Sequence, residues 1–243
     1  MSFKHAIILA CIALLISACT GVNQSIQVDD GTRMDGGLST VNGAIRIGAD
    51  CEIGGQVSNV NGSIQVGANS QIAGAKNVNG SISLGNGSHS GDIRTTNGSL
   101  TFGDDVVING NASTTNGRIR GGERVRVNGN LSAVNGTLNL ASGSHVEEKV
   151  STVNGSIALV NSRAGELETT AGSISLLEGS VIDGDLRVRK PSSGSNRETP
   201  TIIIGKNSKV GGKLEFEREV ELRIHESAET GEISGATPTF FSD

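Results

Sequence analysis

The sequence predicts an all-β fold, a single-stranded parallel β-helix (β-solenoid) of about eleven coils with 18–19 residues each. Three observations predict it: Asn-Gly recurs at a nearly fixed spacing, apolar residues alternate with variable ones beside it, and glycine supplies 35 of the 243 residues. Glycine without a Gly-X-Y period excludes collagen. A hydrophobic content of 35% is low for a globular domain, but it suits stacked coils, which need only a thin apolar stripe per repeat.

The first eighteen residues are predicted to be a secretory signal. Lys4 supplies a positive start, and the apolar run over 6–16 is too short to span a membrane. The sequence ISAC at 16–19 follows and resembles the bacterial lipobox. This resemblance implies that Cys19 is acylated, becomes the first mature residue and anchors the chain in a membrane. Because Thr20 is not Asp, it implies the outer membrane of a Gram-negative cell; an ordinary signal with an incidental cysteine is the alternative.

The Asn-Gly repeat sets the length of the coil. The glycines that follow the seven repeated asparagines, from Gly43 to Gly155, are 19, 18, 18, 19, 19 and 19 residues apart. Ala171-Gly172 fills the next slot, 17 residues later. Two residues after each glycine stands Ile or Leu, and two further on stands a second, mostly apolar residue, which is typical of a short strand with one buried face. Stacked coils predict a structural asparagine ladder at one corner, made of Asn42, Asn61, Asn79, Asn97, Asn116, Asn135 and Asn154.

A second strand is expected before each Asn-Gly, with the pattern aliphatic-x-Gly-x-aliphatic, as in Ile53-Gly55-Val57. The residue just before the asparagine is expected to point inward, at Val41, Val60, Val78, Val134 and Val153. The residue before that one is expected to point outward, at Thr40, Asn59, Asn77, Thr95, Thr114, Thr152 and Thr169. Ice-binding solenoids carry flat threonine arrays, but this column is mixed and one residue wide, which argues against that function.

A two-residue β-hairpin is the rival explanation of Asn-Gly. A hairpin would place Thr40 opposite Ile45 and Asn59 opposite Ile64, so that a polar residue faces a core aliphatic in nearly every repeat. Stacked coils instead place Ile45 over Ile64, which gives an aliphatic ladder inside. The pairing chemistry therefore favours the stack over the meander.

The expected boundaries follow from where the pattern holds. Residues 19–24 are a short tether, and 25–236 form the solenoid, whose first coil and last two coils lack the Asn-Gly. The polar, proline-flanked segment 191–200 is expected to be a loop that protrudes from one corner. Residues 237–243 are a tail, in which two phenylalanines are expected to cover the last coil. Eleven coils at about 4.8 Å each make a rod roughly 50 Å long.

The repeats VNGSIQVG at 60–67 and VNGSISLG at 78–85 resemble those of bactofilins, which are polymer-forming bacterial β-helix proteins, and of adhesin-like β-solenoids of envelope proteins. The resemblance covers most of residues 25–236 and implies a right-handed solenoid with end-to-end association. The export signal and the greater length depart from bactofilins. Apolar residues six apart, at Val60, Val66 and Ile72, also fit the left-handed hexapeptide class, so the right-handed form is the favoured one of two.

Composition and motifs indicate a non-enzymatic protein without cofactor or metal. The net charge of −5 and the absence of Trp and Tyr make nucleic acid a poor partner. His89 and His145 are expected three coils apart, roughly 14 Å, too far for one metal ion. No Cys/His cluster has zinc spacing. Cys51 is expected to be a small corner residue in the slot that Ser70 fills one coil later. A β-helix carbohydrate-active enzyme is the alternative, although such enzymes usually carry aromatic platforms for sugars.

The densest basic cluster consists of Arg118, Arg120, Arg124 and Arg126. It indicates either contact with an anionic envelope polymer or lipid head group, or simply a solvated face. The sequence therefore predicts a structural or interaction protein of the cell envelope. Its expected partners are the membrane, through the lipid anchor, and an envelope polymer, a protein or another copy. The rod would act as an adhesin or scaffold, or self-associate through the unpaired edges of its end coils.

Overall fold

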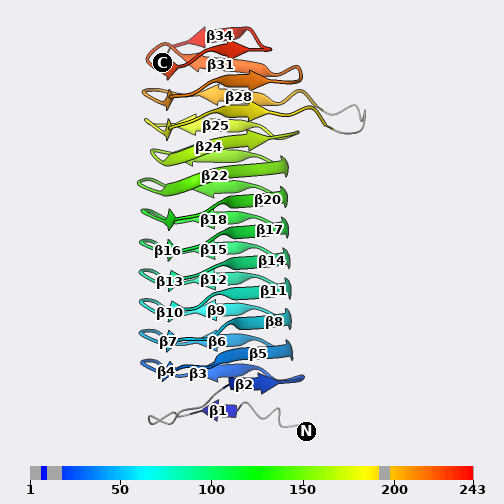
Figure 1. Ribbon diagram of the computed structural model, residues 1–243, viewed down its shortest axis with the longest axis vertical. Coiled ribbons are helices and arrows are strands. Elements are labelled where there is room, and N and C mark those ends of the chain that lie inside the picture. The colour runs from blue at the N-terminus through cyan, green and yellow to red at the C-terminus, as the bar shows by residue number, and fades with distance from the viewer. Residues whose placement is uncertain (1–6, 10–17, 192–197, 243) are drawn as a thin grey trace.

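The computed structural model describes residues 7–9, 18–191 and 198–242, with side chains described from Val22 onward. These residues form a straight rod of about eleven stacked coils, which confirms the predicted β-solenoid (Figure 1). Within this described part every regular element is a strand, and the strands pair in parallel throughout, as in Ile45↔Ile64. The handedness stays a prediction.

Each full coil contributes three strands. In one coil these are β9 (Ile64–Val66), β10 (Gln71–Ile72) and β11 (Ala75–Asn79). The first belongs to a 13-stranded sheet, and the other two belong to a 21-stranded sheet that bends around the rod. Glycines and residues with positive φ lie between the strands, so the chain turns sharply three times per coil.

The 13-stranded sheet takes one short strand from every coil. In order along the rod its strands are β1 (Ile7–Leu9), β3 (Ile26–Val28), β6 (Ile45–Ile47), β9, β12 (Ile82–Leu84), β15 (Leu100–Phe102), β18 (Ile119–Gly121), β21 (Leu138–Leu140), β23 (Ile157–Val160), β25 (Ile174–Leu177), β28 (Thr201–Ile204), β31 (Glu221–His225) and β34 (Pro238–Phe241).

The 21-stranded sheet consists of two ladders. The short-strand ladder contains β4 (Arg33–Met34), β7 (Glu52–Ile53), β10, β13 (His89–Ser90), β16 (Val107–Ile108), β19 (Arg126–Val127), β26 (Val181–Ile182), β29 (Lys209–Val210) and β32 (Glu229–Thr230). The long-strand ladder contains β2 (Ala18–Gly21), β5 (Gly37–Asn42), β8 (Val57–Asn61), β11, β14 (Ile93–Asn97), β17 (Ala112–Asn116), β20 (Leu131–Asn135), β27 (Leu186–Val188), β30 (Leu214–Phe216) and β33 (Ile233–Ser234). Strands β22 (His145–Asn154) and β24 (Arg163–Thr169) run through both ladders and join them.

Like residues lie over like residues along the rod. Ile64 pairs with Ile45 on one side and Ile82 on the other, and Asn61 pairs with Asn42 and Asn79. The in-register parallel pairing excludes the hairpin meander. The buried side chains form one continuous aliphatic column, in which Ile45, Ile64 and Ile82 are fully buried.

The expected direction of two side-chain columns is wrong. The valines before the ladder asparagines are exposed, with Val60 37% and Val78 41% accessible, whereas the polar residues before them are buried, with Asn59 4% and Thr95 0% accessible. The cause is strict strand alternation: Val57 points inward, so Asn59 does too, and Val60 must point outward. Hydropathy alone predicted the reverse, because it does not register that a buried polar group can be hydrogen-bonded.

The ends of the rod extend further than expected. Strand β34 lies within the predicted tail and pairs in parallel with β31, so the sheet continues past residue 236. Its Phe240 remains 62% exposed, while Phe241 contacts His225 edge to face at 5.2 Å between ring centroids. At the other end β2 overlaps the predicted tether and pairs with β5. Most of the predicted signal, and residues 192–197 of the predicted loop, lie outside the described residues.

Candidate functional surfaces

The predicted lipidation residue lies at the start of the stack. The backbone of Cys19 is in β2, where it pairs with Leu38 of β5. Its side chain is outside the described part, so its acylation stays a prediction. Over the described residues, no helix is long and apolar enough to cross a membrane.

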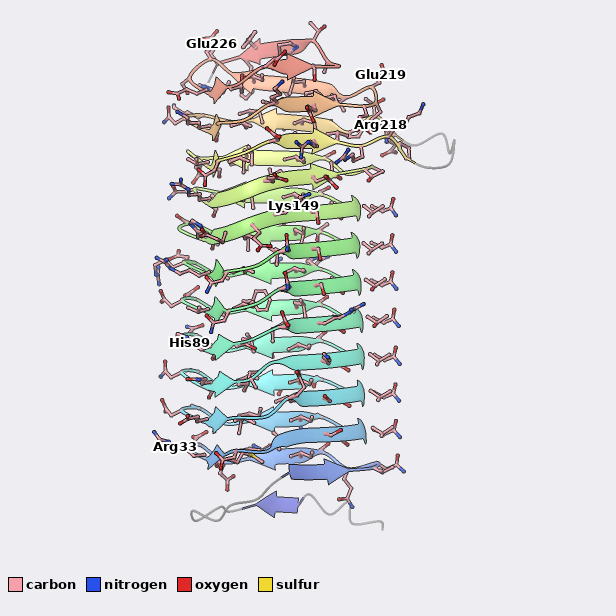
Figure 2. The ribbon with its side chains drawn as sticks, in the orientation of Figure 1. Arg33, His89, Lys149, Arg218, Glu219 and Glu226 are labelled. Carbon is pink, nitrogen blue, oxygen red and sulfur yellow. The ribbon has the colours of Figure 1, made fainter. Side chains whose placement is uncertain are left out.

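The seven predicted ladder asparagines form one hydrogen-bonded column at the ends of the long strands, where Figure 2 shows a row of projecting side chains. In every rung Nδ2 donates to Oδ1 of the preceding coil. The six donor–acceptor distances are 2.8 Å for Asn61 to Asn42, 2.9 Å for Asn79 to Asn61, 2.9 Å for Asn97 to Asn79, 2.8 Å for Asn116 to Asn97, 2.8 Å for Asn135 to Asn116 and 2.8 Å for Asn154 to Asn135. Asn23, which the repeat pattern missed, extends the column by accepting from Asn42.

Close approach between coils explains the glycine that follows each ladder asparagine. A Cβ on Gly62 would lie 2.0 Å from the carbonyl oxygen of Gly43, and one on Gly117 would lie 1.9 Å from that of Gly98. No side chain fits at such distances from a backbone atom. In each Asn-Gly pair the asparagine side chain thus forms a hydrogen bond to another coil, and the glycine lets the backbones of neighbouring coils approach closely.

The buried polar residues that lie two positions before the ladder asparagines form hydrogen bonds to the backbone at the same corner. Thr95 Oγ1 donates to the carbonyl oxygen of Gly80 at 2.9 Å, and Asn59 Nδ2 donates to that of Gly43 at 2.8 Å. These bonds satisfy carbonyl groups that face the core, which is why the polar residues are tolerated there. The residues predicted to form a surface column therefore lie inside the rod, where their hydrogen bonds join neighbouring coils.

Cys51 is 2% exposed, and its N–H donates to Ser70 Oγ in the next coil at 3.1 Å. It thus lies in the corner slot predicted for it. Ser70 Oγ in turn donates to the carbonyl oxygen of Gly48 at 2.9 Å. Burial raises the pKa of the Cys51 thiol, so this side chain is a packed corner residue with little thiolate.

The four predicted basic residues belong to one coil but not to one surface. Arg120 is in β18 of the 13-stranded sheet, while Arg126 is in β19 of the other sheet. Arg118 Nε donates to Thr137 Oγ1 at 3.2 Å. Arg124, at a corner with φ of 55°, pairs with Asp105 at 2.7 Å and with Glu123 at 2.8 Å, and these hydrogen bonds raise its pKa. The cluster in the sequence is therefore spread around the rod.

The two histidines predicted three coils apart do occupy equivalent positions, separated along one ladder by Val107 and Arg126. His145 Nε2 lies 2.9 Å from Glu147 Oε2. Within the described ranges, no group of three or more His, Cys, Asp or Glu side chains is placed to hold a metal ion.

An open hollow of about 440 Å³ lies where β22 bulges between Val146 and Lys149. Asn130, Glu147, Glu148, Lys149 and Glu166 are among its lining residues. Its carboxylates already have partners. Glu148 accepts from Asn130, Lys149 Nζ lies 3.5 Å from Glu166, and Glu147 contacts His145. The hollow is thus lined by charged groups that are paired with one another or with neighbouring side chains.

A ladder of ion pairs between neighbouring coils fastens the C-terminal third, and the sequence reading missed it. The pairs are Arg163–Asp183 at 2.6 Å, Arg187–Glu215 at 2.8 Å, Arg189–Glu217 at 3.1 Å, Lys209–Glu229 at 2.7 Å and Lys213–Glu232 at 3.0 Å. Two of them are 28 residues apart in sequence because the segment 191–200 is inserted between their coils. Removing that segment before aligning the repeats would have brought the opposite charges together.

Comparison with known proteins adds no name to this architecture. No protein-family model matches the sequence, and neither a curated protein nor a solved structure matches it significantly. The geometry of the rod is therefore the basis for any proposal about its function.

Proposed function

We propose that this chain is a non-enzymatic structural or interaction rod of the bacterial cell envelope, anchored in the outer membrane by lipid on Cys19. The observation that carries the proposal is the uninterrupted parallel stack from β3 to β34. In the described coils the regularly repeated polar side chains bond to the next coil instead of converging on one point. Such a stack supplies length and stiffness, as in other solenoids, whose repeats contact only their neighbours.

The position of the lipobox cysteine supports an upright rod. Cys19 lies seven residues before Ile26, the first residue of β3, and its own strand pairs with β5. A seven-residue segment reaches at most about 25 Å even when fully extended. A lipid on Cys19 would therefore hold the N-terminal coil close to the bilayer and direct the β34 end away from it.

The free end and the sides of the rod are the surfaces for partners. Among the described residues, β33 and β34 are the last strands of their ladders, so each has one edge of backbone groups without a neighbouring strand there. Such edges accept a further strand from a partner or another copy. The rod would thus act as an adhesin or scaffold, and the resemblance to bactofilin repeats agrees with self-association.

Membrane fractionation tests the anchor. The Cys19→Ala chain should leave the membrane fraction, while Cys51→Ala, which removes the other cysteine of the mature chain, should stay with it. Retention of Cys19→Ala in washed membranes would refute the anchor. Electron microscopy of the chain from residue 20 onward, which keeps every described core residue, tests the rod and its association. Strictly single rods at all concentrations would count against self-association but leave the anchor standing.

A further inference from the structure

The sequence contains Asn-Gly ten times, and the structure divides these sites into two classes. In eight of them the glycine N–H donates to a carbonyl oxygen of a neighbouring coil at 2.8–3.2 Å. These eight glycines are Gly43, Gly62, Gly80, Gly87, Gly98, Gly117, Gly129 and Gly136. In the other two, Asn109-Gly110 and Asn154-Gly155, the glycine N–H makes no hydrogen bond within the described part of the chain.

The environment of Asn109 differs from that of a ladder asparagine. It is exposed and follows β16 directly, outside any strand. Its Oδ1 accepts from Asn128 Nδ2 at 3.2 Å, whereas its own Nδ2 has no hydrogen bond among the described residues. At this site the backbone nitrogen of the next residue and the side-chain amide nitrogen are both unrestrained, while the side-chain carbonyl is polarised by a donor.

We propose that Asn109-Gly110 is a site of spontaneous deamidation and that Asn154-Gly155 is a slower second site. The Gly110 nitrogen loses its proton to solvent base and attacks Cγ of Asn109. The new N–C bond pushes the carbonyl electrons onto Oδ1, which faces the Asn128 donor. Collapse of this intermediate breaks the bond from Cγ to Nδ2, and ammonia leaves with a proton from solvent. Water then opens the cyclic imide at either carbonyl, giving aspartate or isoaspartate with no change of oxidation state.

The same reaction is held back at the other eight sites. Their glycine nitrogen must first release its hydrogen bond to the neighbouring coil, and at the internal ladder rungs the asparagine amide is also bonded to neighbouring rungs. Each bond that must open first slows the reaction by about two- to tenfold. Six of the sites lie within the asparagine ladder, so the ladder that fastens the coils also protects its own asparagines.

Asn154-Gly155 is intermediate between the two classes. Gly155 lies opposite the slot where the repeat has Ala171-Gly172 in place of Asn-Gly, and the pairing of β22 with β24 ends before it, at Thr152↔Thr169. Its nitrogen is therefore as unrestrained as that of Gly110. However, Asn154 is half-buried, and its Nδ2, the leaving nitrogen, donates to Asn135 at 2.8 Å. These restraints make it the slower site of the two.

Peptide mass spectrometry of the purified full chain tests the inference during incubation in mildly alkaline buffer. Conversion of amide to acid should appear first at Asn109 and then at Asn154, and at the eight restrained sites it should be slower than at Asn109 by about two- to tenfold for each hydrogen bond that must open. In denaturant all ten sites should convert at similar rates, because the fold no longer restrains them. Asn109→Gln should abolish the first signal and leave the second unchanged, since the longer side chain forms the cyclic imide poorly.

Two results would overturn the inference. One is conversion of any ladder asparagine from 42 to 135 as fast as that of Asn109 in the native chain. The other is an Asn109 site that is as slow as the eight restrained sites although denaturant accelerates it. Neither result bears on the lipid anchor, because the reaction depends only on the described coils.

Discussion

Replacing Thr95 by Val tests whether the inward polar column fastens the rod. The two side chains have nearly the same shape, so the change removes only the hydroxyl that donates to Gly80 at 2.9 Å. Thr95 is fully buried, and the Gly80 carbonyl would be left without this donor. Leaving a buried acceptor unsatisfied costs about 1–3 kcal/mol. The additional buried methyl offsets about 0.8 kcal/mol. We therefore expect a net loss of about 0.2–2 kcal/mol, with a central value of about 1 kcal/mol.

Urea unfolding followed by circular dichroism measures this loss. With a slope of about 2 kcal/mol/M, the middle of the usual range, a loss of about 1 kcal/mol lowers the midpoint by roughly 0.5 M. The matched control is Thr96→Val, one residue further along the same strand, which faces outward and should stay within about 0.5 kcal/mol of the parent chain. Equal midpoints for the two variants, or a more stable Thr95→Val chain, would refute the fastening role of the column.

Three further predictions concern other parts of the stack. Asn97→Ala removes two exposed ladder hydrogen bonds and should lower the unfolding free energy by about 1 kcal/mol; an unchanged urea midpoint would show that the ladder adds nothing. Gly117→Ala places a Cβ 1.9 Å from a backbone oxygen and should cost more than about 3 kcal/mol or prevent folding, so a parent-like thermal midpoint would contradict the close approach. Hydrogen bonding from Arg124 lowers the pKa of Asp105, so Asp105 stabilises the fold above its unfolded pKa of about 3.9, and this contribution disappears as pH falls through the lower folded value. Arg124→Gln should therefore flatten the acid limb of the stability–pH curve; an unaltered limb would exclude that contribution.

The fold could be predicted because its determinant is a repeat. One period fixes which residue lies over which, so Ile45 over Ile64 and Asn42 over Asn61 followed from spacing alone. The same logic predicted the asparagine ladder at one corner, although not the hydrogen bonds that join its side chains. The last two coils lack Asn-Gly, but they could still be predicted because their apolar residues keep a period of two.

The direction of the side chains was harder to predict, since in the long strands before Asn-Gly the apolar side chain is not always the buried one. Strand alternation buries Asn59 and exposes Val60, and the Gly43 carbonyl that accepts from the Asn59 amide nitrogen lowers the cost of that burial, which no hydropathy pattern records. Arg120 and Arg126 are only six residues apart in sequence, yet the corner between β18 and β19 places them in different sheets. In a chain that turns three times per coil, residues that are close in sequence need not share a surface.

Two kinds of side-chain interaction join the coils of the rod. Neutral amide bonds run as one column from Asn23 to Asn154, where ion pairs such as Arg124–Asp105 also join coils, and from Arg163 to Glu232 a series of ion pairs joins the coils without that column. Exposed ion pairs contribute little singly and are screened by salt, whereas the amide column carries no net charge to screen. The exchange occurs where coil length also changes, from 19 residues to 17 at Ala171-Gly172. The asparagine column tolerates coils of both 18 and 19 residues, and it ends where Ala171 takes the place of the next asparagine. The ion pairs need no identical residue in every coil, and Arg187–Glu215 and Arg189–Glu217 join the two coils between which the segment 191–200 is inserted.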